Sequence, residues 1–137
     1  MSHFTTIKTE LRNLAAVESA LRRLGFNYER GGTIEDYYHN TLEVDLRVHI
    51  PGPRPVGFRH NQSSGVYELV GDWFGGDTSQ EEFMTSLTHH YAREQVRESL
   101  ERQGVDLSRV KEREEPDGSV VFEVPLDEDQ METMIGG

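Results

Sequence analysis

The residues best suited to chemistry in this chain are its six histidines, because an imidazole can bind a metal ion or transfer a proton near neutral pH. His89 and His90 are adjacent in a predicted helix, so their side chains point about 100° apart and do not form the i, i+4 pair that binds zinc from one side. His49 falls on the polar face of a predicted strand, and His60 lies near a turn. We predict surface histidines and no metal site, with a site of His49, His60 and strand carboxylates as the alternative.

His3 is a separate case because of its distance from the amino terminus. A histidine third from a free amine has the spacing for square-planar copper or nickel binding. Removal of Met1 before the small Ser2 would destroy that spacing. We therefore interpret His3 as a strand residue.

Charged side chains share the polar face of the predicted central strands. Glu68 and Asp72 are four residues apart, or about 13 Å at roughly 3.3 Å per residue, whereas a glycosidase pair needs about 5 to 9.5 Å, so they do not form such a pair. Pairing the strands so that polar residues meet places Arg47 opposite Arg59, and Arg59 opposite Glu68. We interpret these residues as a salt-bridged surface row, and the alternative is an anion site at Arg47 and Arg59.

The sequence contains no motif for nucleotide binding and no cysteine for thiol chemistry. The glycine pairs at 31–32, 75–76 and 136–137 follow none of the phosphate-loop spacings, and no lysine accompanies them. The absence of cysteine excludes disulfides, thiolate metal sites and cysteine nucleophiles. We predict no cofactor and no catalytic residue, and we prefer a non-enzymatic role.

The single tryptophan, Trp73, is followed by Phe74 in a predicted loop before a long helix. An exposed Trp-Phe edge would anchor a partner protein, since large aromatic side chains dominate many interfaces. Packing of these rings under the helix is the competing interpretation and the commoner outcome. We predict Trp73 and Phe74 as candidate partner-binding residues.

Hydrophobic periodicity predicts the elements that position these side chains. Capping residues and apolar spacing predict helices over 13–25 and 78–104. Strict alternation over 42–50 predicts one strand, the first of a three-stranded antiparallel meander. The expected fold class is α+β, an antiparallel sheet with two helices packed on one face, plus a C-terminal hairpin. We expect a single domain over residues 1–124 and an acidic, flexible tail over 125–137.

The net charge of −11 is concentrated in the second half of the chain. Residues 1–60 carry 8 basic and 7 acidic side chains, whereas residues 61–137 carry 6 and 18. Because phosphate contacts need a positive surface, nucleic-acid binding is disfavoured, and a partner protein with a basic surface is the more natural complement. The sequence has neither a membrane-spanning apolar run nor a signal-peptide pattern, so we expect no membrane partner and a cytoplasmic location.

Several stretches together resemble the hypothetical chloroplast reading frame 35 family, a domain of unknown function present in cyanobacteria, plastids and other bacteria. They are the opening residues 1–12, Leu24-Gly-Phe, the Tyr-Glu-Leu-Val-Gly-Asp strand at 67–72, Tyr91-Ala with Val96, and Glu115-Pro-Asp-Gly-Ser. The resemblance runs from Met1 to about Val124. Three features depart from the family pattern. Position 71 is glycine where we expect a small residue such as alanine, the hairpin lacks a basic end, and the chain adds an acidic tail. The resemblance implies no reaction or cofactor, and it suggests association with an AAA-type ATPase.

We therefore expect a small protein of uncharacterised role that binds another protein or assembly through Trp73-Phe74 or the acidic tail. One alternative is a ubiquitin-like or sulfur-carrier modifier that acts through Gly136-Gly137, since a bare C-terminal carboxylate on a Gly-Gly end can be adenylated. Another is a metal- or anion-binding enzyme subunit. The sequence contains no nucleophile and base pair to support that last class.

Overall fold

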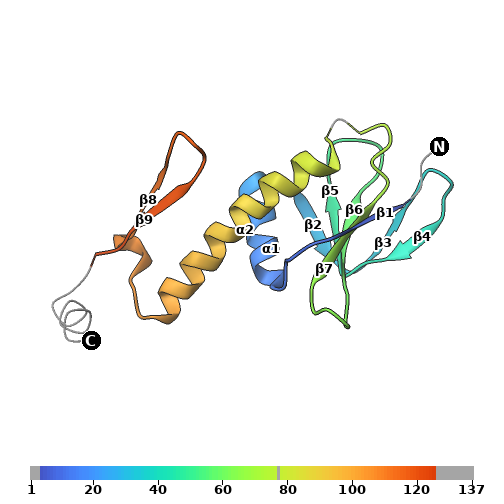
Figure 1. The fold of residues 1–137 in the computed structure, drawn as a ribbon. Coiled ribbons are helices and arrows are strands. Elements are labelled where there is room, and N and C mark those ends of the chain that lie inside the picture. Colours follow the sequence, from blue (N-terminus) through green and yellow to red (C-terminus); the bar gives the residue numbers. More distant parts are fainter. Residues whose placement is uncertain (1–3, 77, 126–137) are drawn as a thin grey trace. The chain divides into compact units, whose positions relative to one another are not determined.

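The structure is a computed structural model that describes residues 4–76 and 78–125. Contacts divide the chain into two compact units, residues 1–94 and 95–137, and each is described by itself (Figure 1). The helices are α1 (Leu14–Leu24), α2 (Gln80–Arg102) and the short η1 (Leu107–Arg109). The strands are β1 (Thr5–Lys8), β2 (Asn27–Arg30), β3 (Thr33–Glu35), β4 (Thr41–Glu43), β5 (Leu46–His49), β6 (Val56–His60), β7 (Tyr67–Gly71), β8 (Lys111–Glu114) and β9 (Val120–Glu123).

Three of the predictions concern residues that the structure does not describe. They are the interpretation of His3, the flexible tail over 126–137, and the Gly136-Gly137 end. The prediction of a single domain over residues 1–124 stays a prediction, because the boundary between the two units falls inside α2.

Helix α1 begins and ends where its capping residues predict. The Asn13 side chain accepts a hydrogen bond from the Ala16 N–H, and Gly25 takes the left-handed conformation with φ 83° that ends the helix. Its buried side, which includes Val17 and Leu21, faces the core.

Helix α2 is also fixed by local signals at both ends. The Ser79 hydroxyl accepts from the Glu82 N–H at 3.1 Å, and Gly104, with φ 84°, follows its last residue. Phe83 and Leu87 are its buried residues. In the described part of the chain, neither helix has an apolar stretch long enough to cross a bilayer.

The sheet has the order β1-β7-β6-β5-β2, and every neighbouring pair is antiparallel. One face buries the apolar residues Leu46, Val48, Val56, Phe58 and Leu69 against α1 and the buried residues of α2. The predicted α+β class, with helices packed on one face of an antiparallel sheet, is confirmed. The meander of β5, β6 and β7 is confirmed as well.

The prediction of a single strand over Leu42–Ile50 is wrong. The chain breaks at Val44 and Asp45, so that β4 leaves the main sheet and pairs with β3, a strand that the sequence did not predict. Val44 is buried with Ile34 and Val70 in a second apolar cluster. Since Val70 follows Leu69 in β7, this cluster lies on the face opposite the helices, which the β3–β4 pair covers.

The break has a steric and a polar cause. Val44 lies directly against Gly57 of β6, and a Cβ on that glycine would come within 2.5 Å of Val44 Cγ1. The Asp45 N–H donates to the Phe58 carbonyl at 2.9 Å, and its carboxylate accepts from the His60 N–H at 2.6 Å. These contacts stabilise a conformation in which Val44 points to the opposite face from Leu46, although both are apolar and two residues apart.

Strands β8 and β9 form the C-terminal hairpin that the sequence predicts, with Gly118 in the turn at φ 89°. Arg97 of α2 pairs with Glu112 of β8 within the same unit. None of residues 95–125, the described part of this unit, is fully buried.

The contact between Val44 and Gly57 is testable by substitution. Gly57→Ala is expected to lower the free energy of unfolding by about 1 to 3 kcal/mol, because the added methyl group overpacks the second cluster. In a Val44→Ala background, the same change is expected to cost about 1 kcal/mol less, since the close contacts with Val44 Cγ1 and Cγ2 are removed and only the contact with its Cβ, at 2.8 Å, remains. Urea unfolding of the four proteins measures both values, and an equal cost in the two backgrounds would contradict the contact.

Candidate functional site

The two arginines of the predicted anion site do not face each other. In the observed register, Arg47 lies opposite Gly57 and Arg59 lies opposite Glu68. The prediction that Arg47 faces Arg59 is therefore wrong, because β5 and β6 pair two residues away from the predicted register. The predicted pairing of Arg59 with Glu68 is confirmed, and Arg59 Nη2 lies 3.5 Å from Glu68 Oε2.

Arg47 and His49 share a carboxylate on the neighbouring strand. Arg47 Nε donates to Glu29 Oε1 at 2.6 Å, and His49 Nε2 lies 2.8 Å from the same oxygen. The hydrogen bond from the His49 ring, followed by the one from Arg47, lowers the pKa of Glu29 below its usual value. Arg47 is thus part of an ion-pair cluster on the sheet, where Glu29 already occupies the place of an external anion.

The other histidine of the metal hypothesis lies apart from this cluster. The His60 ring stacks near Tyr67, with ring centroids 5.0 Å apart. In the described part of the chain, no three His, Cys, Asp or Glu side chains gather closely enough to hold a metal ion.

The structure separates Trp73 from Phe74. The Trp73 ring packs against the core, with its centroid 5.6 Å from that of Phe83 in α2, and its buried Nε1–H has no hydrogen-bond partner among the described residues. The Phe74 side chain points outward, and 58% of the residue is exposed. Of the two predicted residues, Phe74 is the more exposed, and Trp73 is half-buried against the core.

Phe74 belongs to a group of exposed aromatic rings from two loops. Tyr37 and Tyr38, in the turn between β3 and β4, are 51% and 45% exposed. The ring centroids of Tyr37 and Phe74 are 6.0 Å apart and those of Tyr37 and Tyr38 are 5.2 Å apart, with edge-to-face angles of 82° and 88°. We name Tyr37, Tyr38 and Phe74 the aromatic platform. The Arg54 guanidinium lies over the Tyr37 ring, 5.4 Å from its centroid.

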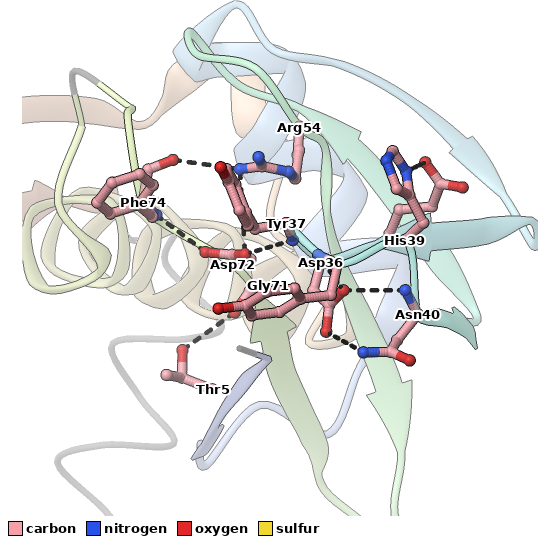
Figure 2. A network of polar contacts seen from close by, with 11 residues as sticks. Thr5, Asp36, Tyr37, His39, Asn40, Arg54, Gly71, Asp72 and Phe74 are labelled. Carbon is pink, nitrogen blue, oxygen red and sulfur yellow. Dashed lines mark hydrogen bonds and ion pairs between the residues drawn. The ribbon is translucent and has the colours of Figure 1, made fainter. Parts of the chain in front are cut away.

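A buried carboxylate ties the two loops of the platform together, as Figure 2 shows. Asp72 Oδ2 accepts from the Tyr37 N–H at 2.7 Å, and Oδ1 accepts from the Phe74 N–H at 3.1 Å. Arg54 Nη1 lies 4.0 Å from Asp72 Oδ2 and donates to the Phe74 carbonyl at 3.3 Å. Because the Asp72 side chain is only 1% exposed, these bonds are shielded from water and hold the backbone on both sides of the platform.

A second buried carboxylate shapes the tyrosine turn. Asp36 accepts from the Tyr38 N–H, the Asn40 N–H and the Asn40 side-chain amide, each at 2.9 Å. Burial by itself would raise the pKa of Asp36, but these three hydrogen bonds outweigh it and hold the pKa below its usual value. The turn also requires His39 to adopt φ 64°, a left-handed conformation that is unfavourable for a residue with a Cβ.

Tyr37, Tyr38, Arg54 and the supporting roles of the two aspartates were not predicted from the sequence. One local signal was present, because Asp-Tyr-Tyr-His-Asn combines two adjacent aromatic residues with side chains that favour turns. The arrangement contains no nucleophile next to a base. It presents exposed aromatic side chains on a backbone that hydrogen bonds to Asp36 and Asp72 hold in place.

The strained turn predicts a stabilising substitution. His39→Gly is expected to raise the free energy of unfolding by about 0.5 to 1 kcal/mol, because glycine adopts a positive φ without the steric cost of a Cβ. His39→Ala is the matched control, since it also removes the imidazole but keeps the Cβ, and it is expected to bring no gain. Thermal unfolding of the three proteins measures the effect, and a loss of stability with glycine would contradict the assigned strain.

The lowered pKa of Asp36 predicts a pH dependence. A carboxyl group with a lower pKa in the folded state stabilises the fold above its unfolded value of about 3.9, and this contribution is lost as the pH falls through the folded value. The stability difference between the native chain and Asp36→Asn is therefore expected to shrink as the pH falls below about 4. Urea unfolding of both proteins between pH 7 and 2.5 measures it, with the carboxyl groups that do not interact with Asp36 cancelling in the difference. Asp72, whose charge raises the pKa of Asp36, does not cancel. A constant difference would refute the interpretation.

Comparisons with known proteins agree with the family resemblance. A family model described as "Protein of unknown function (DUF1257)" matches residues 20–122. The chain is 27% identical over 122 residues to "Uncharacterized protein ycf35" of Trieres chinensis, an alignment that covers 87% of this chain and 93% of that protein. It is 28% identical over 123 residues to "Uncharacterized protein ycf35" of Pyropia yezoensis, with 88% and 93% covered. No solved structure gives a significant match. The resemblance to the hypothetical chloroplast reading frame 35 family is thereby confirmed, and the chain belongs to the DUF1257 family of proteins of unknown function.

Proposed function

We propose that this protein acts as a non-enzymatic binding or assembly protein, and that the aromatic platform is its anchor for a partner protein. The observation that supports the proposal is the combination of exposure and rigidity in Tyr37, Tyr38 and Phe74. Each is about half exposed or more, yet hydrogen bonds to buried Asp72 and Asp36 hold the backbone that carries them.

This combination is favourable for binding on energetic grounds. Covering a large aromatic side chain removes apolar area from water at about 25 cal/mol per Å², and aromatic residues dominate interface hot spots. Side chains on a rigid backbone lose less conformational freedom when a partner covers them. Monomeric proteins seldom cluster exposed aromatic rings from separate loops unless the patch has a function.

No described residue favours the other functions that we considered for this chain. The modifier hypothesis depends on Gly136-Gly137, which lie outside the described residues, and the anion hypothesis assumed that Arg47 faces Arg59, whereas Arg47 lies opposite Gly57. An AAA-type ATPase as the partner is suggested by the family resemblance alone.

The proposal predicts a loss of partner recovery from single substitutions. Three tagged proteins are purified from the native cell: the native chain, Phe74→Ala and Tyr38→Ala. Mass spectrometry measures the amount of each protein that co-purifies with them. Truncation of a hot-spot side chain costs about 2 kcal/mol or more, so at least one partner is expected to fall by about tenfold or more in both variants.

Val96→Ala is the matched control, because Val96 is an exposed apolar residue outside the platform. Exposed substitutions change stability by about 0.5 kcal/mol or less, and unfolding midpoints check that the variants remain folded. Equal recovery of every partner by the native chain, the control and both platform variants would refute the proposal.

A further inference from the structure

We propose that the aromatic platform recognises an arginine side chain in a basic segment of its partner protein. The inference rests on the proposed function and names the chemistry by which the partner is bound. Three features of the described residues support it: the orientation of the rings, the internal use of Arg54, and an excess of negative charge beneath the rings.

The platform already holds one guanidinium. Arg54 lies over the Tyr37 face at 5.4 Å, within the range in which a cation is attracted to the negative face of an aromatic ring. The neighbouring rings of Tyr38 and Phe74 meet Tyr37 edge-on, at 88° and 82°. The three rings are not stacked face to face, and Tyr38 and Phe74 remain 45% and 58% exposed.

Arg54 itself is not available to an incoming anion. Its side chain is 18% exposed, its Nη1 donates to the Phe74 carbonyl, and its charge lies 4.0 Å from Asp72. Among the described residues of the platform and its support, an acidic partner segment would therefore meet aromatic rings, and the guanidinium of Arg54 is already engaged. This argues for a cationic rather than an acidic partner.

The charges at the base of the platform favour a cation. Asp36 and Asp72 are both buried beneath it, and Arg54 offsets only one of them. Glu35 precedes Asp36 and adds an exposed carboxylate, 3.8 Å from the His39 ring. Residues 1–94, the unit that carries the platform, have 9 basic and 13 acidic side chains, a net charge of −4, which attracts basic segments at longer range.

Arginine is favoured over lysine for a geometric reason. A guanidinium is planar and weakly hydrated, so it stacks on an aromatic face at a smaller desolvation cost than an ammonium group. Arg54 on Tyr37 is an example of this stacking within the same site.

The test uses three synthetic peptides of identical sequence, Gly-Ser-X-Gly-X-Ser-Gly, in which X is arginine, lysine or citrulline. Citrulline has nearly the shape of arginine but no charge. Binding is followed by backbone amide NMR shifts of the full chain at low salt. We expect the arginine peptide to shift the backbone amide signals of residues 35–40 and 72–76. The lysine peptide is expected to bind at least twofold more weakly, and the citrulline peptide is expected not to bind. Affinity for the arginine peptide is expected to fall with added salt.

Leucine variants separate cation–π binding from simple apolar contact. Phe74→Leu and Tyr38→Leu keep a large apolar side chain but remove the aromatic face. Each is expected to weaken binding of the arginine peptide at least threefold. Val96→Leu is the matched control and is expected to leave its affinity unchanged. Equal binding of arginine and citrulline peptides, unchanged binding by both leucine variants, or shifts confined to other acidic surfaces would each overturn the inference.

The two proposals fail in different ways. If no peptide binds while Phe74→Ala still loses a cellular partner, the arginine inference is wrong and the binding function stands. If the arginine peptide binds at the platform while partner recovery is unchanged in Phe74→Ala and Tyr38→Ala, the site recognises arginine but is not the anchor for a partner.

Discussion

The interaction on which the rest of the site depends is the pair of hydrogen bonds that the buried Asp72 carboxylate accepts from Tyr37 and Phe74. A carboxylate removed from water is costly unless hydrogen bonds and an opposite charge compensate it. Asp72 receives both, from two backbone N–H groups and from Arg54 nearby. Because each N–H comes from a different loop, satisfying this one charge requires the loops to stay together. The exposed rings are therefore positioned by a group that is itself hidden.

The fold supplies the support beneath this carboxylate. The β3–β4 pair covers part of the outer face of the sheet through a small cluster of Ile34, Val44 and Val70. That cluster exists because the chain breaks before β5 and because Gly57 leaves room for Val44. The turn that carries the tyrosines is thus attached to the sheet by packing at one end and by Asp72 at the other. A lone two-stranded hairpin would be only marginally stable in water.

The same region contains several features that are unfavourable for the stability of the fold. Three large aromatic residues are exposed, His39 is held in an unfavourable conformation, and two carboxylates are buried near each other. Such local conflicts between propensity and structure are expected where a surface is adapted to a ligand, since residues elsewhere stabilise the fold. Membership of the DUF1257 family identifies relatives but no chemistry, so a function has to be argued from this site.

The sequence by itself determined the elements whose signals are local. Both helices begin and end at their capping residues, the C-terminal hairpin forms at its turn, and the absence of cysteine excludes whole classes of chemistry. The tertiary structure decided the rest. Strict alternation of apolar residues did not reveal that Val44 turns away from Leu46, because the cause is a glycine on another strand. Nor did it place Tyr37 beside Phe74, since Tyr37 is held by Asp72, a residue 35 positions away in the chain. Contacts of this kind depend on strand register and on which faces are covered, and these are settled only when distant segments pack together.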